Sequence, residues 1–169
     1  MNLTVRSAFL VVVLISTFSF APAQEAKPGI LGGDDLKKLV PASYFFHGQT
    51  APVQLRNSAG IHAQDGKVVL AGLVDTSGYS SDIQQKYQGF LITEMKLNVG
   101  GSSLAPGQYG FGFSKDGKFT VMDVGGNDVI NASASSDDKL QRPVPLKIVQ
   151  EDDGYRLYSG KKWVSLKLR

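Results

Sequence analysis

Short runs of alternating apolar and polar residues, separated by turn residues, dominate the chain from Tyr44 onward. The clearest stretch extends from Tyr87 to Val124, and its runs are separated by Gly100-Gly101 and by Asp116-Gly117. A period of two is typical of a half-buried β-strand. An Asp-Gly pair between two such runs is a strong hairpin signal, because a type I′ turn needs positive φ at both central residues. This stretch therefore predicts a β-meander around which the rest of the fold is organised.

Similar runs predict strands on both sides of the meander. Asp-Gly pairs recur at Asp65-Gly66 and Asp153-Gly154, each between two β-like runs. Residues 68–74 are apolar on both faces, which predicts a central strand covered on both sides. The pattern predicts about eight to ten short strands joined mostly by tight hairpins. We expect an all-β fold, a single antiparallel β-barrel or β-sandwich in up-and-down order, with a short N-terminal helix.

The first 33 residues have the composition of a targeting segment followed by a leader. Residues 1–23 combine one basic residue, an apolar run over 7–20 and the sequence Ala21-Pro22-Ala23, which is typical of a secretory signal peptide. The apolar run is shorter than the roughly 18 residues of a spanning helix, so cleavage is favoured over an uncleaved membrane anchor. Residues 24–33 predict a flexible leader. We expect an exported protein, periplasmic or extracellular, with no membrane span after cleavage.

A short amphipathic helix is predicted at the start of the domain, over residues 34–40. Leu36, Leu39 and Val40 follow the spacing of one helical face, behind two aspartates that suit a helix N-terminus. Pro41 ends the pattern, because the residue before a proline is biased away from helical dihedrals. A further helical turn is expected around residues 82–86. The predicted organisation is one domain over residues 34–169.

Composition narrows the classes of function. The chain has no cysteine, which excludes disulfides, thiol nucleophiles, a lipoprotein anchor and c-type haem attachment. Its formal net charge is +3 and its basic residues are scattered, so the basic stripe that a nucleic acid requires is missing. We therefore predict no nucleic-acid partner and no cofactor. The pattern predicts no particular oligomeric state.

One segment has a counterpart in other proteins. Residues 96–111 contain the glycine turn Gly100-Gly101, followed by Leu-Ala-Pro-Gly-Gln-Tyr. This arrangement resembles a hairpin of several families of exported bacterial β-domains of unknown function. The resemblance implies an exported β-sheet domain and no particular activity, because the hairpin is an element of the scaffold.

Catalytic chemistry has few candidate residues. His47 and His62 are the only histidines, and neither has the His-x-His spacing or the nearby third ligand of a typical zinc site, so no metal is predicted. A Gly-x-Ser-x-Gly nucleophile elbow is missing. The enzyme alternative is a hydrolase that uses His62 with Asp65 or Glu94. The structural alternative is that both histidines are hydrogen-bonded or solvated.

Two aromatic features are candidates for ligand binding. Tyr109 and Phe111 share one face of a predicted strand. Gly110 and Gly112 leave its other face bare, which allows close approach by a ligand or by another backbone. Trp163 alternates with the apolar positions of the last strand and is expected on an outer or rim face, where an indole can stack on a sugar or a partner. The structural alternatives are glycines that relieve crowding and a tryptophan that caps a barrel.

The favoured prediction is non-catalytic binding of a small apolar or sugar-like ligand, or of an envelope protein. The predicted binding residues are Tyr109, Gly110, Phe111, Gly112 and Trp163, and no catalytic residue is assigned. The hydrolase is one alternative. A structural component of the envelope is the other, and it predicts neither ligand nor turnover.

Overall fold

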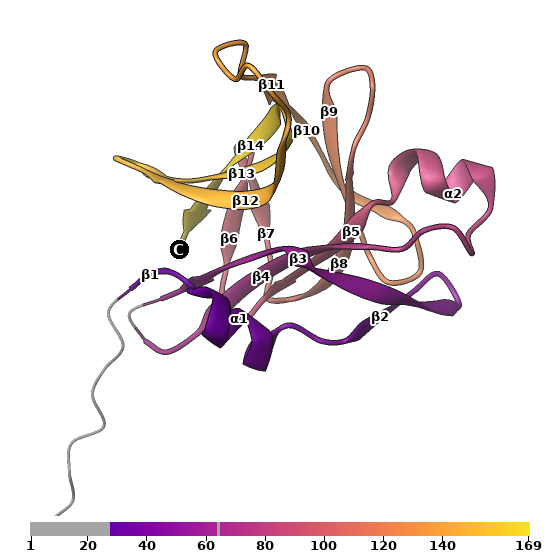
Figure 1. The fold of residues 1–169 in the computed structure, drawn as a ribbon, viewed down its shortest axis with the longest axis horizontal. Coiled ribbons are helices and arrows are strands. Elements are labelled where there is room, and N and C mark those ends of the chain that lie inside the picture. Colours follow the sequence, from indigo (N-terminus) through magenta and orange to yellow (C-terminus); the bar gives the residue numbers. More distant parts are fainter. Residues whose placement is uncertain (1–27, 64) are drawn as a thin grey trace, which may run out of the picture.

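The chain folds into two antiparallel β-sheets that pack against each other (Figure 1). The computed structural model describes residues 28–63 and 65–169. Strands make up 57% of the described residues and helices 9%, and the two sheets do not close into a barrel. The prediction of an all-β antiparallel fold is confirmed, in a sandwich-like form. The predicted signal peptide, residues 1–23, lies outside the described residues.

The first sheet has the strand order β1-β3-β4-β5-β8-β9-β10, with β2 paired to β3. The strands β3, β4 and β5 are neighbours in this sheet and consecutive in the chain, and so are β8, β9 and β10. Much of the predicted up-and-down order is therefore present in this sheet. The strands are β1 (Gly29–Ile30), β2 (Ser43–Phe46), β3 (Gln49–His62), β4 (Val68–Val74), β5 (Gly89–Thr93), β8 (Gly107–Phe113), β9 (Lys118–Met122) and β10 (Asp128–Ser133).

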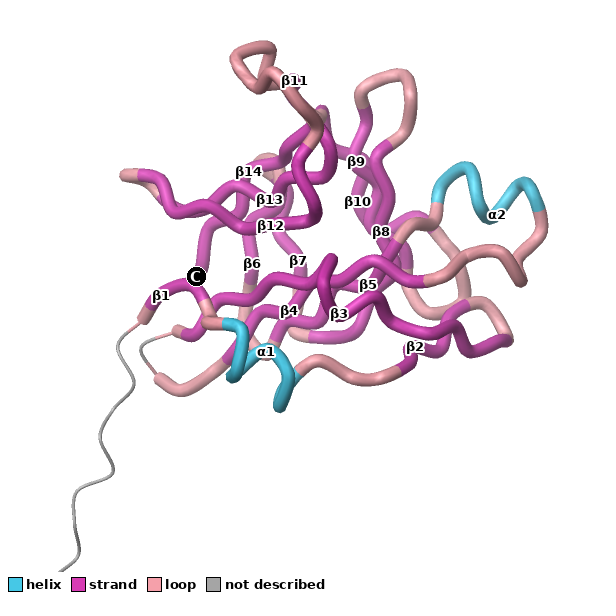
Figure 2. Tube along the Cα trace, in the orientation of Figure 1, coloured by secondary structure: helices cyan, strands magenta, loops and turns pink. Residues whose placement is uncertain are grey.

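The second sheet has the order β12-β13-β14-β6-β7, with β11 paired to β14 (Figure 2). Its strands are β6 (Leu97–Val99), β7 (Ser102–Leu104), β11 (Ser135–Ser136), β12 (Val144–Glu151), β13 (Gly154–Gly160) and β14 (Lys162–Leu168). The described residues thus form fourteen strands. The number exceeds the prediction because several strands have only two or three residues.

The meander predicted over residues 87–124 is divided between the two sheets. After β5, the β6–β7 hairpin leaves the first sheet and pairs with β14 in the second. The chain turns between Thr93 and Met95, where the Thr93 Oγ1 hydroxyl donates to the Met95 carbonyl at 2.6 Å. This crossover lets Leu97 and Leu104 enter the core between the sheets from the second sheet. The prediction of one continuous meander is therefore wrong.

An apolar core fills the space between the sheets. Aromatic rings of β8 and β9 lie at its centre, and the centroids of Phe111 and Phe119 are 5.5 Å apart. Burial of this apolar surface is the main stabilising term for a chain without disulfides. Among the fully buried members of this core are Ile61, Val69, Leu91, Phe111, Phe119, Leu157 and Leu166.

A second, aromatic core lies on the outer face of the first sheet. Phe46 stacks on Tyr87 with ring centroids 3.9 Å apart, and Tyr44 stacks on Phe90 at 5.2 Å. Strand β4 supplies both cores, because Val69 and Ala71 face the second sheet while Leu70 and Val74 face outward, which confirms a central strand covered on both sides. The buried members of this aromatic core are Tyr44, Phe46, Ala51, Leu70, Val74, Tyr79, Tyr87, Phe90 and Met122.

Two tyrosine hydroxyls are buried in the aromatic core without a partner. The Tyr79 hydroxyl donates to the Phe46 carbonyl at 3.1 Å. The hydroxyls of Tyr44 and Tyr87 are buried and have no hydrogen-bond partner among the described residues. An unpaired buried hydroxyl costs about 1–3 kcal/mol. The aromatic core therefore gains apolar contact at the expense of two unpaired polar groups.

All three Asp-Gly pairs stand at hairpin turns, as predicted. Asp65-Gly66 joins β3 to β4, Asp116-Gly117 joins β8 to β9, and Asp153-Gly154 joins β12 to β13. The glycine of each pair has positive φ, at 82°, 81° and 135° in turn, whereas His47 is the only described residue other than glycine with positive φ. The aspartates thus do not have the positive φ that a type I′ turn requires, and these turns differ from the predicted type.

Two short helices cover the outer face of the first sheet (Figure 1). Helix α1 (Gly33–Leu39) and helix α2 (Ser81–Lys86) were both expected from the sequence pattern. Leu36 of α1 and Ile83 of α2 pack against the aromatic core. Across residues 28–63 and 65–169, neither helix has the length and apolar character needed to cross a membrane.

The predicted leader is partly integrated into the fold. Its described part begins at residue 28, and Gly29–Ile30 forms strand β1, which pairs with Ile61 and His62 at the end of β3. The Leu31 N–H continues this contact by donating to the Gly60 carbonyl at 2.9 Å. Residues 29–33 therefore belong to the folded domain.

Candidate functional site: a pocket beneath helix α1

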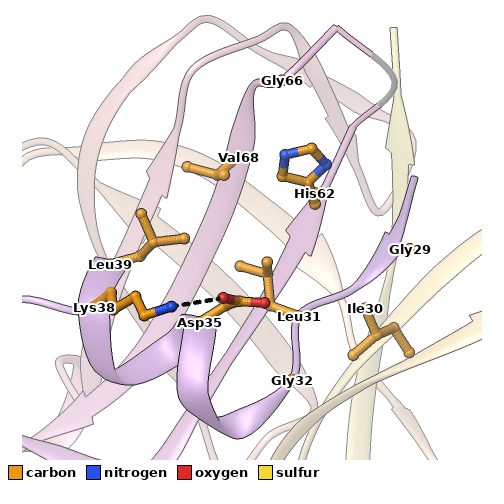
Figure 3. Close-up of a pocket in the computed structure, with 10 residues that line it drawn as sticks. All are labelled: Gly29, Ile30, Leu31, Gly32, Asp35, Lys38, Leu39, His62, Gly66 and Val68. Carbon is orange, nitrogen blue, oxygen red and sulfur yellow. Dashed lines mark hydrogen bonds and ion pairs between the residues drawn. The ribbon is translucent and has the colours of Figure 1, made fainter. Parts of the chain in front are cut away.

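A pocket opens between helix α1, strand β1 and the β3–β4 hairpin (Figure 3). Its cavity measures about 390 Å³. Aliphatic side chains and glycines form most of its wall, and three side chains supply its polar groups. The lining residues are Gly29, Ile30, Leu31, Gly32, Asp35, Lys38, Leu39, His62, Gly66 and Val68.

Pairing between β1 and the end of β3 forms one wall of the pocket. Gly29 lies opposite His62 and places residues 29–32 alongside the hairpin. A Cβ atom on Gly60 would lie only 2.6 Å from Leu31 Cδ1. Glycine at position 60 therefore lets the Leu31 side chain lie against the sheet, and the cavity remains between this segment and α1.

Helix α1 covers the pocket without being deeply buried itself. Leu36 and Val40 pack against the aromatic core, but none of the residues of α1 is fully buried. Leu39 remains 42% exposed, and Figure 3 shows its side chain directed toward Val68. An exposed aliphatic side chain beside a cavity is available for contact with a ligand.

The polar groups of the pocket lie at two places. Lys38 Nζ is 3.5 Å from Asp35 Oδ1, and both side chains are largely exposed. The ring of His62 lies at the other end of the pocket (Figure 3). Its Nδ1 atom is buried and has no hydrogen-bond partner in the described part of the chain. The pocket thus has an exposed ion pair at its mouth and a histidine ring in its wall.

The structure does not assemble the predicted hydrolase residues into a catalytic pair. His62 pairs with Val68, and the Glu94 Oε2 atom accepts the Val68 N–H at 2.9 Å, so the two residues flank Val68 on opposite sides. Their backbones are two strand spacings apart, about 10 Å. The Asp65 carboxylate accepts hydrogen bonds from the Lys67 ammonium and N–H, which hold its pKa below the usual range. Neither acid lines the pocket.

The glycine face of β8 is covered by the chain itself. A Cβ atom on Gly110 would lie 2.4 Å from Phe46 Cε2. A Cβ atom on Gly112 would lie 2.0 Å from the Lys86 carbonyl oxygen. The close approach expected from these glycines is thus made by an aromatic ring and by the backbone of the last residue of helix α2.

The two aromatic candidates of β8 point toward the other face of the sheet. Phe111 is fully buried in the core between the sheets. Tyr109 packs at the edge of that core, and its hydroxyl donates to the Ala105 carbonyl at 3.1 Å. The structure brings neither residue to the pocket beneath α1.

Trp163 lies on the outer face of the second sheet, as its alternation with Val164 predicts. Its side chain is partly exposed. The Arg156 guanidinium carbon lies 4.1 Å from the centroid of the Trp163 ring, and the Tyr158 ring lies 6.4 Å away. Trp163 is therefore separate from both the pocket and the glycine face of β8.

His47, the second histidine, lies away from the pocket. It occupies the turn between β2 and β3 with φ of 47°. Its ring fills the space beside Gly126, where a Cβ atom would lie 2.6 Å from His47 Cδ2. Within residues 28–63 and 65–169, no three His, Asp or Glu side chains are close enough together to hold a metal ion.

The sequence pattern did not predict the pocket. Its walls come from the contiguous segment of residues 29–32 and α1, and from the tip of the β3–β4 hairpin, which lies more than 20 residues further along the chain. One signal was available, because Ile30 and Leu31 are large apolar residues inside a glycine-rich segment. A flexible leader does not need such residues, whereas a segment that pairs with a sheet edge does.

Comparison with known proteins identifies no relative. No protein-family model, no curated protein and no solved structure matches this chain. The function has to be inferred from the geometry and chemistry of the site itself.

Proposed function

We propose that the protein binds a small, mainly apolar molecule with one acidic group in the pocket beneath helix α1, without chemical turnover. The observation that supports this proposal most strongly is a cavity of about 390 Å³ with aliphatic walls and the Lys38 cation at its mouth. Small-molecule sites are concave, mostly apolar and equipped with a few polar groups that orient the ligand. The pocket has these three properties.

The dimensions of the cavity favour a compact ligand. Its 390 Å³ is near the lower end of the range of about 300–1,000 Å³ for small-molecule sites. Ile30 and Leu39 are 47% and 42% exposed. A ring system seated against either side chain would remove its apolar surface from water, which contributes about 25 cal/mol per Å².

The polar groups favour an acidic head group. The Lys38 ammonium lies at the mouth, where a carboxylate or sulfonate can pair with it beside Asp35. Lys38 is the cation among the pocket residues, so an acidic head group can compete with Asp35 for it.

Leu39→Glu is expected to weaken binding of the aromatic acid anilinonaphthalene sulfonate by about tenfold. The substitution removes an aliphatic wall and places a carboxylate against an anionic ligand. Because Leu39 is 42% exposed and no residue of α1 is fully buried, the fold should persist. Fluorescence titration of wild type and variant measures the change.

Val129→Glu is the matched control. Val129 is a 48% exposed apolar residue of β10, at the opposite edge of the first sheet from β1. Val129→Glu adds the same charge as Leu39→Glu but away from the pocket. The affinity for anilinonaphthalene sulfonate should therefore stay within about twofold of wild type. Equal losses in both variants, or no loss in Leu39→Glu, would count against the pocket.

Lys38→Gln tests the preference for an acid. We expect about two- to fivefold weaker binding of anilinonaphthalene sulfonate, the range of an exposed ion pair. N-phenyl-naphthylamine has the same rings without the sulfonate and should bind both proteins equally. If both probes lose affinity to the same extent, Lys38 does not recognise the acidic group.

A further inference from the structure

We propose that the outer face of the second sheet is a second binding surface and that it binds acidic polysaccharide. The proposal goes beyond the pocket and uses none of its residues. Leu157 and Val164 belong to the core between the sheets, so the residues that alternate with them face outward. We name this surface the outer C-terminal face, and its residues are Lys147, Arg156, Tyr158, Trp163, Ser165 and Lys167.

Cations and aromatic rings alternate across the strands of this face. Lys147 is paired with Tyr158, and its Nζ atom lies 5.3 Å from the centroid of that ring. Tyr158 is paired with Trp163, whose ring centroid is 6.4 Å from that of Tyr158. The Arg156 guanidinium carbon lies 4.1 Å from the Trp163 ring centroid. Strand pairing thus holds two rings and two cations in one continuous array.

One ring of the array is buried and hydrogen-bonded, whereas the other ring and the guanidinium are accessible to solvent. Tyr158 is only 5% exposed, and its hydroxyl donates to Asp137 Oδ2 at 3.2 Å. The Trp163 ring and the Arg156 guanidinium remain partly exposed. A rigid ring beside an accessible guanidinium loses little conformational entropy when a ligand binds.

Acidic groups lie at two places on this face: Asp137 beside Tyr158, and the β12–β13 hairpin at one end. Arg156 Nη1 is 3.4 Å from Glu151 Oε1, and Lys167 pairs with Asp153. Glu151 and Asp153 both flank the turn of the β12–β13 hairpin. Away from the hairpin, the Asp137 carboxylate is engaged by the Tyr158 hydroxyl, and Lys147 and Ser165 add a cation and a hydroxyl to the face.

Two further cations extend the face where β6 begins and β14 ends. The Arg169 N–H donates to the Lys96 carbonyl at 3.0 Å, so these two residues lie side by side. Both are exposed. The positive charge thus follows β14 from Trp163 toward the C-terminus, which suits an extended anionic chain better than a single anion.

An acidic sugar polymer matches this chemistry. Pyranose rings stack on an indole, carboxylates accept bidentate hydrogen bonds from arginine, and the Ser165 hydroxyl can bond to a sugar hydroxyl. A nucleic acid would need a denser row of cations free of acids. An anionic membrane would need apolar side chains that insert between lipids, whereas both rings here are flanked by cations. The export predicted from residues 1–23 would expose this face to envelope polysaccharides.

Binding of the full chain to sodium polygalacturonate, measured by titration calorimetry at low salt, tests this proposal. We expect binding that weakens as salt increases and is at least about tenfold weaker for the fully methyl-esterified polymer. Trp163→Ala and Lys147→Gln should each weaken it by about five- to tenfold. Lys37→Gln, which makes the same charge change on exposed α1, should leave it unchanged.

Four results would overturn the outer C-terminal face as a polysaccharide site. The first is equal affinity for charged and esterified polymer, and the second is unchanged binding in both Trp163→Ala and Lys147→Gln. The third is absence of binding to polygalacturonate, and the fourth is binding only to single-stranded oligothymidylate or to anionic phospholipid vesicles. Leu39→Glu should not alter polymer binding, so failure here is distinguishable from failure of the pocket.

Discussion

Above pH 10 the free energy of unfolding should fall by about 1.4 kcal/mol per pH unit for each of two tyrosines, because neither can ionise readily in the folded protein. Tyr87 is 0% and Tyr44 4% exposed. Burial, followed by the charge interaction with Tyr79, raises the pKa of both phenols above the ordinary 10.0. Below that pH the folded and unfolded chains both keep these protons, so stability is unaffected. Above it only the unfolded chain releases them, and stability is lost.

Urea unfolding followed by circular dichroism, between about pH 8 and pH 11, measures this dependence. Tyr44→Phe and Tyr87→Phe should each remove about 1.4 kcal/mol per pH unit from this dependence. At neutral pH each should also stabilise the protein by about 1 kcal/mol, because each removes a buried hydroxyl without a partner. Tyr109→Phe is the control, since its hydroxyl donates to the Ala105 carbonyl and its loss should destabilise.

Two results would contradict the burial of these hydroxyls without a partner. The first is a wild-type stability that stays constant through pH 10 and above. The second is destabilisation by Tyr87→Phe at neutral pH, which would show that the hydroxyl makes a hydrogen bond in solution.

Gly112→Ala should destabilise the protein by about 3 kcal/mol, the upper end of the usual cost of overpacking. A Cβ atom there would lie 2.0 Å from the Lys86 carbonyl oxygen and 2.8 Å from its carbon. Both atoms are backbone. The segment that follows them is held to β8, because the Gln88 N–H donates to the Phe111 carbonyl at 2.8 Å. Helix α2 therefore cannot move away without breaking its attachment to the sheet.

Gly78→Ala is the matched control for this substitution. The nearest atom to a Cβ at position 78 is 3.7 Å away, and the φ of Gly78 is not positive. Its effect should stay within about 0.5 kcal/mol. Chemical denaturation of both variants provides the comparison, and equal stability of the two would show that β8 and α2 are not in close contact.

Features that depend on neighbouring residues could be predicted from the sequence. Residues 68–74 are apolar at every position, and the structure covers both faces of β4. The three Asp-Gly pairs mark hairpins because a glycine at positive φ is a local requirement. Helix α1 follows the apolar spacing of Leu36 and Val40, which face the aromatic core.

Features that depend on distant contacts could not be predicted in this way. Strands β5 and β6 have similar local patterns, but pairing of Val99 with Leu166 places β6 in the second sheet. The glycines of β8 predicted a close approach, yet no local pattern identifies Phe46 as the group that fills the space beside Gly110. The pocket likewise exists only because residues 29–32 lie beside the β3–β4 hairpin.

Amide chemical-shift mapping of isotope-labelled protein during titration with anilinonaphthalene sulfonate tests the proposed pocket most directly. The pocket predicts saturable shifts of the amides of Gly29, Gly32, Lys38, Gly66 and Val68, which line it. The amides of β12, β13 and β14 should not shift, and in Leu39→Glu the changes should saturate at about tenfold higher ligand concentration. Shifts concentrated on those three strands, or no saturable shifts at all, would contradict the proposal that the site beneath helix α1 binds a small acidic ligand.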